Sequence, residues 1–289
     1  MASKILTGDV PELMENILNN ITEDFHYSLF SCALVSRHWY IYFSGSSGIK
    51  SGILHSLGRN EQFFSRLQYL SLGVMSEFSA ENATALLSIL ARNATKIGAL
   101  RFEEFEPDYD PQVIHALIRI IKSQEELKQF NIVGGFLPKK FQGIISALES
   151  QKQSLREVII EGCGYSTEFK MLMNCENLEI LRIRYCDYER ILGFFDYNIN
   201  TLEVVDCEID GSKIALFFEK SGTLLQRLKL ESYDARIDEQ PLLLESLKSF
   251  CPNITYLDFS NIEFSTQLLD LIADGLKKNP YPRLMAYRK

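Results

Sequence analysis

Two stretches decide the fold: LREVIIEGC at positions 155–163 and LEILRIRYC at positions 178–186. Both follow one rule: an apolar residue, two variable residues, an apolar residue, one variable residue and a final apolar residue. In the first stretch the apolar positions are Leu155, Val158 and Ile160. The alternation at the end of the rule is typical of a short strand with one buried face.

The same spacing recurs along most of the chain. Copies start at Leu67, Ile97, Leu127, Leu155, Leu178, Leu202, Leu225 and Ile254, and a degenerate ninth copy is possible from Leu284. Successive starts lie 30, 30, 28, 23, 24, 23 and 29 residues apart. In the sixth copy the three apolar positions are Leu202, Val205 and Cys207. A short unit repeated at this period is the sequence mark of a stacked repeat protein.

The segments between copies have helical spacing. Asp110-Pro111 predicts the start of a helix, with a cap followed by proline in the first turn. The side chains that this helix would bury are Val113, Ile114, Leu117, Ile118 and Ile121. A later helix before Cys251-Pro252 would bury Leu242, Leu243, Leu247 and Phe250. One strand–helix unit cannot bury its apolar face alone, whereas stacked units share a continuous core.

These patterns predict an α/β protein: a curved solenoid with parallel strands on the concave face and helices on the convex face. The alternative is a doubly wound α/β sheet, in which strands also alternate with helices. The repeated spacing favours the solenoid, and no G-x-G-x-x-G follows any of the expected strands.

The repeats resemble the leucine-rich repeat family, whose units have roughly 20–29 residues. That family usually carries Asn or Cys at the ninth position of each copy, and here Cys163 and Cys186 match it. The other copies depart from the pattern with Met75, Phe105, Gly135, Asp210, Tyr233 and Ile262. By this resemblance, residues 63–289 form a leucine-rich-repeat array of about eight repeats.

Residues 7–43 have a different character and predict three short helices. Asp9 and Pro11 are suited to starting the first one, and its apolar residues are Leu13, Met14, Ile17, Leu18 and Ile21. The third short segment opens at Arg37 and ends at Phe43. Domains this small usually need a metal, disulfides or a partner for stability. Residues 44–62, with Ser44–Gly48 at their start, are expected to be a linker and a possible repeat cap.

The N-terminal stretch resembles the F-box, through Val10-Pro11-Glu12-Leu13 and Val35-Ser36-Arg37-His38-Trp39. The resemblance implies docking on a Skp-family adaptor, and through it on a cullin–RING ubiquitin ligase. The residues that it implies for this contact are Val10, Pro11, Leu13, Ile17, Leu18, Ile21, Leu29, Cys32 and Val35. The alternative is a helical cap on the solenoid, which terminal repeats need.

A target protein would contact the variable strand positions, which face the concave surface. Arg182, Arg184, Arg227 and Tyr256 are the expected contacts, because arginine and tyrosine are common binding hot spots. The alternative is that the charges neutralise one another across neighbouring strands, with Asp206 and Glu208 beside the basic residues.

Composition narrows the function classes. The net charge of −8 and the pI near 5.2 argue against a nucleic-acid partner. No apolar run approaches the roughly 18 residues of a membrane span, and Met1–Val10 lacks a signal-peptide pattern, so we expect a soluble cytoplasmic or nuclear protein. The six cysteines form no CxxC pair, which predicts free thiols and no zinc site.

Nothing in the sequence predicts catalysis or a cofactor. None of the four histidines, His26, His38, His55 and His115, lies in HExxH or beside a nucleophile motif. We therefore expect that the protein is not an enzyme. The F-box resemblance implies instead a substrate-recognition adaptor of an SCF-type ubiquitin ligase. The alternative is a leucine-rich-repeat interaction scaffold with a degenerate F-box and no ubiquitin role.

Overall fold

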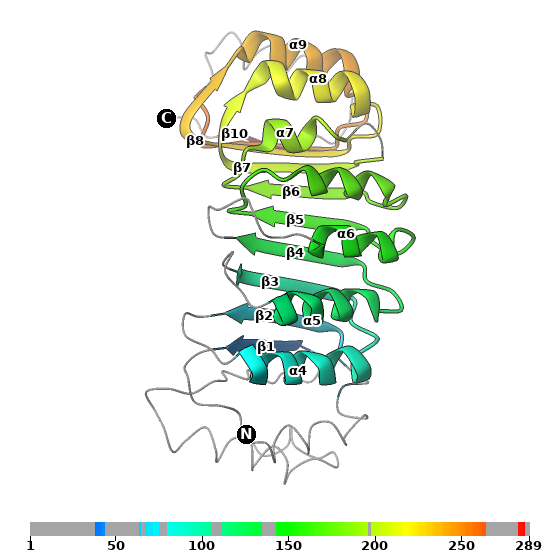
Figure 1. Cartoon of the computed structure of the whole chain (residues 1–289). Coiled ribbons are helices and arrows are strands. Elements are labelled where there is room, and N and C mark those ends of the chain that lie inside the picture. Colours follow the sequence, from blue (N-terminus) through cyan, green and yellow to red (C-terminus); the bar gives the residue numbers. More distant parts are fainter. Residues whose placement is uncertain are drawn as a thin grey trace, which may run out of the picture. The chain divides into compact units, whose positions relative to one another are not determined.

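The computed structural model describes residues 38–43, 64, 67–74, 80–105, 111–134, 143–195, 198–263 and 283–286. The chain divides into two compact units, Met1–Lys128 and Gln129–Lys289. In each unit parallel strands alternate with helices, and the helices lie against one face of the strands (Figure 1). This arrangement is compatible with an α/β solenoid.

The first unit contains β1 (His38–Phe43), β2 (Tyr69–Val74), α4 (Ala80–Asn93), β3 (Ala99–Phe105) and α5 (Pro111–Lys122). Strand β2 pairs in parallel with β1 on one side and β3 on the other. Leu70 lies opposite Leu100 and Leu72 opposite Phe102, and all four side chains are buried. The residues between them point to the other face of the strands, because side chains alternate along a strand.

Strand β1 shows that one prediction from the sequence is wrong, namely a third short helical segment that ends at Phe43. His38–Phe43 is instead a strand, with His38 opposite Tyr69 and Phe43 opposite Val74. The run HWYIYF is rich in aromatic and β-branched residues, which favour strands. Residues 7–37 lie outside the described residues, so the rest of the F-box-like module stays a prediction. Ser44–Gly48 lies between β1 and β2 in the chain.

The Gln124 side chain links the end of α4, the end of α5 and the approach to β3 in the first unit. It is buried, accepts a hydrogen bond from the Ile97 backbone N–H at 2.9 Å, and donates to the carbonyls of Ala94 and Ile120 at 2.8 Å each. These are backbone groups at the ends of α4 and α5 and at the approach to β3. A buried amide thus satisfies groups that would otherwise be costly to bury.

The second unit repeats the strand–helix arrangement from β4 to β10. Its strands are β4 (Gln129–Gly134), β5 (Glu157–Glu161), β6 (Ile180–Arg184), β7 (Thr201–Asp210), β8 (Arg227–Asp238), β9 (Tyr256–Ser260) and β10 (Arg283–Ala286). Between them lie α6 (Ile144–Ala147), η1 (Leu148–Gln151), η2 (Thr167–Asn174), α7 (Tyr188–Leu192), α8 (Gly211–Ser221) and α9 (Gln240–Phe250).

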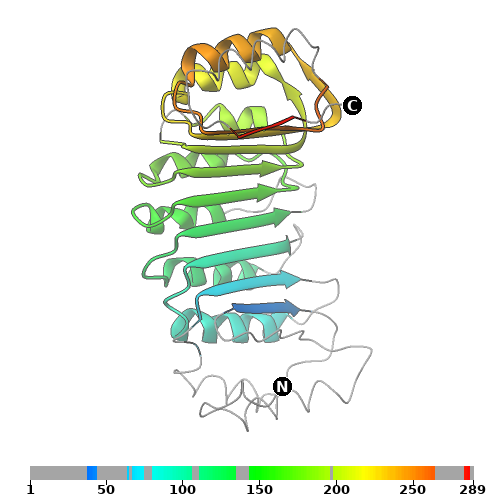
Figure 2. The same cartoon turned by 180° about the vertical axis from the view of Figure 1, so that it is seen from behind.

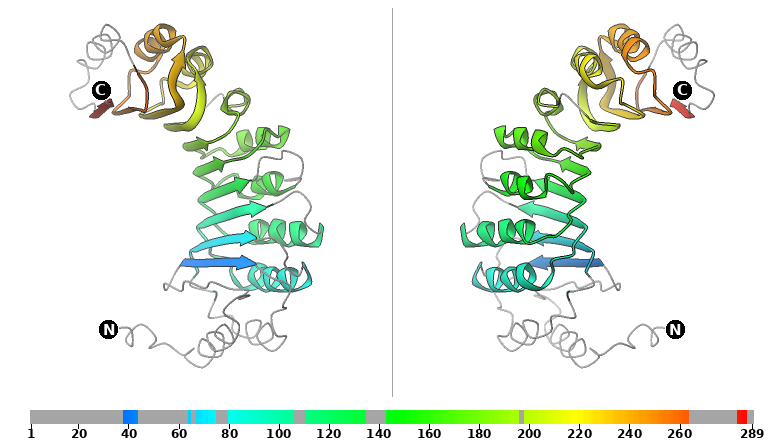
Figure 3. Two further views of the ribbon diagram at one scale, coloured as in Figure 1. Left: turned by 90° about the vertical axis from the view of Figure 1, so that its left-hand side faces the viewer. Right: turned by 90° about the vertical axis from the view of Figure 1, so that its right-hand side faces the viewer.

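The strands of the second unit pair in chain order, each in parallel with the next. The described helices of this unit lie on one side of the strands (Figure 3). A doubly wound sheet would carry helices on both faces and would reverse its strand order at a switch point. The doubly wound alternative therefore does not describe this fold.

The strand register corrects the sixth copy of the repeat. Leu181 lies opposite Leu202 and Ile183 opposite Val204, so this copy runs Ile199, Leu202, Val204 rather than Leu202, Val205, Cys207. Ile199, Leu202 and Val204 are fully buried. A register shift follows between Val205 and Cys207, around Asp206, whose φ is 53°. The bulge returns Cys207 to the buried side after Val205 has faced outward.

Two helices bury faces that differ from the predicted ones. In α5 the buried residues are Val113, Ala116, Leu117, Ile120 and Ile121, so the stripe is rotated away from Ile114 and Ile118. In α9 the buried residues are Leu243, Leu244, Ser246 and Leu247, whereas the predicted Leu242 and Phe250 are exposed. Both helices are apolar over more than one stripe, and contact with the strands selects which stripe is buried.

A ladder of cysteines runs along the strand ends of the second unit. The Cys163 backbone N–H donates to the Cys186 Sγ at 3.3 Å, and the Cys186 backbone N–H in turn contacts the Cys207 thiol. The Cys186 Sγ donates to the Arg184 carbonyl at 3.0 Å. With the corrected frame, all three cysteines are the ninth residue of their copy. The ladder therefore satisfies backbone groups where the chain leaves each strand.

Burial keeps these thiols protonated. Burial raises the pKa of Cys186 to about 12, and burial together with the charge of Cys186 raises the pKa of Cys163. Burial likewise raises the pKa of Cys207. Because the thiolate is the reactive form of cysteine, this ladder is structural rather than nucleophilic. The described cysteines are free thiols, as expected, and all are buried except Cys186, which is partly buried.

Cys186→Ala should destabilise the fold more than Cys175→Ala, by about 1–3 kcal/mol, because it leaves the Cys163 N–H without its acceptor. Cys175 is a matched control, since it is also buried with a pKa raised by burial to about 11, but its sulfur has no place in the ladder. Cys186→Ser keeps an acceptor and should recover part of the loss. Urea unfolding measures the three variants, and equal losses for both alanine variants would contradict the role of the ladder.

Candidate functional site

The strands of the second unit leave one face uncovered by helices, and we call it the open face (Figure 2). On β5 to β9 it carries the residues that alternate with the buried ones. They form three rows across the strands: Glu157, Ile180, Thr201, Arg227, Tyr256; then Ile159, Arg182, Glu203, Lys229, Asp258; then Glu161, Arg184, Val205, Glu231, Ser260. The open face corresponds to the surface predicted as concave.

Arg182 lies at the centre of an ion-pair network. Its Nε donates to the Glu157 Oε1 at 2.7 Å, and its Nη1 donates to the Glu203 Oε1. Its side chain is 25% exposed, and both glutamates are less exposed than that. Burial acts to lower the pKa of Arg182, but the hydrogen bonds to the two carboxylates outweigh it and raise the pKa. Arg182 thus links β5, β6 and β7 through one guanidinium.

Neighbouring cations are also paired within the face. The Arg184 Nη2 lies 3.8 Å from the Glu203 Oε2, and the Lys229 Nζ lies 3.0 Å from the Glu231 Oε2. Burial acts to lower the pKa of Lys229, but the hydrogen bond to Glu231 and nearby carboxylates raise it. Close pairing of this kind holds side chains in fixed positions on a surface that is otherwise open to solvent.

Arg227 and Tyr256 form a second cluster at the amino ends of β8 and β9. The Arg227 guanidinium lies 4.3 Å from the centre of the Tyr256 ring, within the range of a cation–π contact. The Tyr256 hydroxyl donates to the Asp258 Oδ2 at 3.1 Å, and the Ser260 Oγ donates to Asp258 Oδ1 at 2.5 Å. Burial and the hydrogen bond to Asp258 raise the pKa of Tyr256.

The structure therefore brings the four expected target contacts onto one face but separates them into two clusters. Arg182 and Arg184 belong to the ion-pair network, whereas Arg227 and Tyr256 contact each other. Ion pairs across neighbouring strands, the alternative interpretation, are found for Arg182 and Arg184, whereas Lys229 pairs with Glu231 of its own strand. Their partners are Glu157, Glu203 and Glu231 rather than the expected Asp206 and Glu208.

Sequence reasoning missed Tyr185, which follows β6 directly. Its side chain is 53% exposed, and its hydroxyl is hydrogen-bonded to Asp206 at the bulge of β7. Tyr185 and Asp206 both have positive φ, at 51° and 53°. Gly162 has φ 60° at the equivalent point after β5, and a Cβ there would lie 2.9 Å from the Gly134 oxygen. The sequence signal for Tyr185 is its position directly after a strand, which is equivalent to that of Gly162 after β5.

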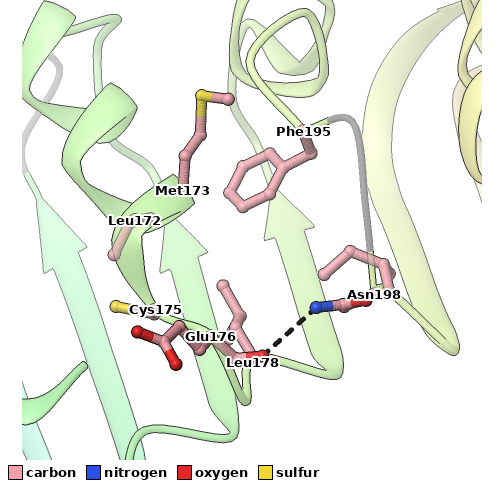
Figure 4. Close-up of a pocket in the computed structure, with 8 residues that line it drawn as sticks. Leu172, Met173, Cys175, Glu176, Leu178, Phe195 and Asn198 are labelled. Carbon is pink, nitrogen blue, oxygen red and sulfur yellow. Dashed lines mark hydrogen bonds between the residues drawn. The ribbon is translucent and has the colours of Figure 1, made fainter. Parts of the chain in front are cut away.

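A separate pocket of about 310 Å³ lies on the helix side of the second unit, beside η2 and the segment after α7 (Figure 4). Met173 and Phe195 lie toward one end, and Glu176 and Asn198 lie toward the other. The Asn198 Nδ2 donates to the Glu176 carbonyl at 3.2 Å. The titratable side chains of the lining are Glu176 and Cys175, and burial raises the pKa of the Cys175 thiol to about 11.

The nine residues expected to contact a Skp-family adaptor, from Val10 to Val35, lie outside the described residues. Among the residues that the structure describes, no group of three or more His, Cys, Asp or Glu side chains is placed to hold a metal ion. In the same part of the chain, no helix is long and apolar enough to cross a membrane.

A scan against protein-family models found no match to this chain, and a search of curated proteins found no significant match either.

Arg182→Ala should cost about 1–2 kcal/mol of unfolding free energy. It leaves Glu157 and Glu203 without their shared donor, and solvent screening reduces the penalty below that of a fully buried pair. Arg156→Ala is the control, because Arg156 lies 3.9 Å from Glu179 and both side chains are largely exposed. It should cost below about 0.5 kcal/mol. Urea unfolding compares the two, and indistinguishable losses would mean that the network does not stabilise the fold.

Asp206→Asn should lower the pKa of Tyr185. The hydrogen bond to the Asp206 carboxylate, followed by that group's charge, raises this pKa, because both oppose formation of a phenolate. Asparagine tolerates the positive φ at this position, so the backbone should be retained. NMR titration of the tyrosine Cζ resonances, assigned with Tyr185→Phe, measures the shift. Glu245→Gln on the exposed side of α9 is the control and should leave the Tyr185 titration unchanged.

Proposed function

We propose that this chain is a substrate-recognition adaptor of an SCF-type ubiquitin ligase. In this proposal the F-box-like residues 7–37 dock on a Skp-family adaptor, and a curved array of leucine-rich repeats binds a target protein for ubiquitination. The observation that carries the proposal is the combination, in one chain, of the motif from Val10-Pro11 to Val35-Ser36-Arg37-His38-Trp39 with parallel strand–helix repeats that expose an open face.

The open face supports the target-binding half of the proposal. Its charged side chains are held by ion pairs at 2.7 and 3.0 Å, so their positions are largely set before a partner arrives. Binding is stronger when fewer side chains must be ordered in the complex. A preorganised polar surface on paired strands is suited to a protein partner, whereas small molecules usually occupy apolar pockets.

The place of β1 supports a short connection between the two halves. Because β1 begins at His38, the last two residues of the F-box-like motif, His38 and Trp39, already belong to a strand of the first unit. Ser44–Gly48 follows that strand and does not separate the motif from the repeats. A short connection suits a ligase receptor, since the target must be presented at a defined distance from the ubiquitin donor.

One observation favours the alternative of an interaction scaffold without a ubiquitin role. His38–Phe43, the last six residues of the expected helical module, is paired with β2 as a strand. The residues left for a helical F-box are therefore fewer than the resemblance implies. In a scaffold with a degenerate F-box, the repeats would bind a partner and no Skp-family adaptor would associate.

Co-expression of the full chain with a Skp-family adaptor, followed by affinity capture, tests the proposal. The wild-type chain should capture the adaptor, and Pro11→Ala combined with Leu13→Ala should reduce capture by at least about tenfold, a loss of 1.4 kcal/mol or more. Pro241→Ala combined with Leu242→Ala is the matched control on α9, where Leu242 is exposed.

The control variant should capture the adaptor as well as the wild type does. No capture by the wild-type chain would favour the scaffold, whereas full capture by the Pro11 and Leu13 variant would show that the contact is made elsewhere.

A further inference from the structure

The cations of the open face are largely committed within that face. Arg182 is shared between Glu157 and Glu203, Lys229 is paired with Glu231, and Arg227 lies over the Tyr256 ring. An incoming anion would have to compete with these contacts. The arginines are therefore better suited to fixing the surface than to recognising an acidic partner.

Carboxylates gather near Tyr185, from the carboxyl end of β5, the bulge of β7 and the interior of β8. The cation beside them is Arg184, which lies opposite Glu161 and is paired with Glu203. We call Glu161, Tyr185, Asp206 and Glu231 the acidic margin. In the part of the chain that the structure describes, neither Glu161 nor Asp206 forms an ion pair. Tyr185 is hydrogen-bonded to Asp206 and lies within the electrostatic influence of Glu161 and Glu231. The register supports this grouping, because Glu161 lies opposite Arg184, the residue before Tyr185, and Glu231 lies opposite Val205, the residue before Asp206. Carboxylates beside an exposed aromatic ring make an environment that attracts cations.

Asn131 lies on β4, the strand that pairs with the β5 strand of Glu161. Its neighbours Phe130 and Ile132 are buried on the helix side, so alternation places Asn131 on the open face, opposite Ile159. The residue is only 6% exposed, yet within the described part of the chain its Oδ1 accepts no hydrogen bond. A buried acceptor without a donor costs about 1–3 kcal/mol, which an N–H group from a bound partner would recover.

We infer that the acidic margin and Asn131 bind a basic segment of the target protein, an exposed stretch that carries Lys or Arg side chains. This inference rests on the proposed function, because it names the class of target that the open face recognises. One cationic side chain lies over Tyr185 between Glu161 and Asp206, and an N–H donor of the segment reaches Asn131. The net charge of −8 on the chain favours the approach of such a segment.

Fluorescence anisotropy with the full chain tests the inference. The probe is a short labelled peptide in which Lys and Arg alternate with Gly and Ser, and its partner peptide has Glu in place of every Lys and Arg. The basic peptide should bind, with an affinity that falls as ionic strength rises, and the acidic peptide should not. Combining Glu161→Gln, Asp206→Asn and Glu231→Gln should weaken binding by about tenfold or more.

The matched control combines Glu176→Gln, Glu219→Gln and Glu245→Gln, which removes the same charge from exposed positions outside the open face. Its affinity should stay within about twofold of the wild type, a difference below 0.5 kcal/mol. Equal weakening by both triple variants would overturn the inference, because binding would then follow net charge alone. Absence of binding by the basic peptide would overturn it as well.

If the triple variant at the acidic margin fails to fold, Tyr185→Ala and Tyr185→Phe test the inference instead. The alanine variant should weaken binding severalfold, whereas phenylalanine keeps the ring and should retain most of the affinity. Adaptor capture with the same preparations separates the two proposals. Peptide binding without adaptor capture would remove the ubiquitin role alone, and adaptor capture without peptide binding would remove the basic-target inference alone.

Discussion

In the second unit, Leu181, Leu202, Leu228 and Leu257 lie opposite one another on neighbouring strands, and the rest of that unit depends on this alignment. Parallel pairing stacks each buried aliphatic residue on its equivalent in the next repeat, and the helices pack over the resulting stripe. A slip of one residue would turn every buried side chain toward solvent. The first unit obeys the same constraint through Leu70 and Leu100.

The same register arranges the charges on the opposite face. Once the aliphatic residues are aligned, Arg182 is placed between Ile159 and Glu203, with Glu157 diagonal to it, and its ion pairs follow from that placement. The cysteine ladder obeys the register as well, because Cys163, Cys186 and Cys207 leave their strands at equivalent points. Core, ladder and ion-pair network are thus three results of one alignment, seen on the helix side, at the strand ends and on the open face.

The sequence alone predicts the period of the strand–helix repeat. It does not predict in every copy which residues take the three buried positions. Around residue 200 two sets satisfy the rule, Ile199-Leu202-Val204 and Leu202-Val205-Cys207, and only the bulge at Asp206 distinguishes them. The partners of the arginines could not be predicted for the same reason, since cross-strand neighbours depend on the frame. Strand β1 was missed because the aromatic run His38–Phe43 lacks the leucines of the other copies.

Arg182 couples three successive repeats of the second unit to one another. One guanidinium serves Glu157 of the preceding repeat and Glu203 of the following one, so three repeats share a single charge balance. Replacing any one of them by a repeat from another protein would leave a mismatched charge on its neighbours. In related sequences the residues at these three positions should therefore vary together, and new recognition surfaces should arise by exchange of whole blocks of repeats rather than one repeat at a time.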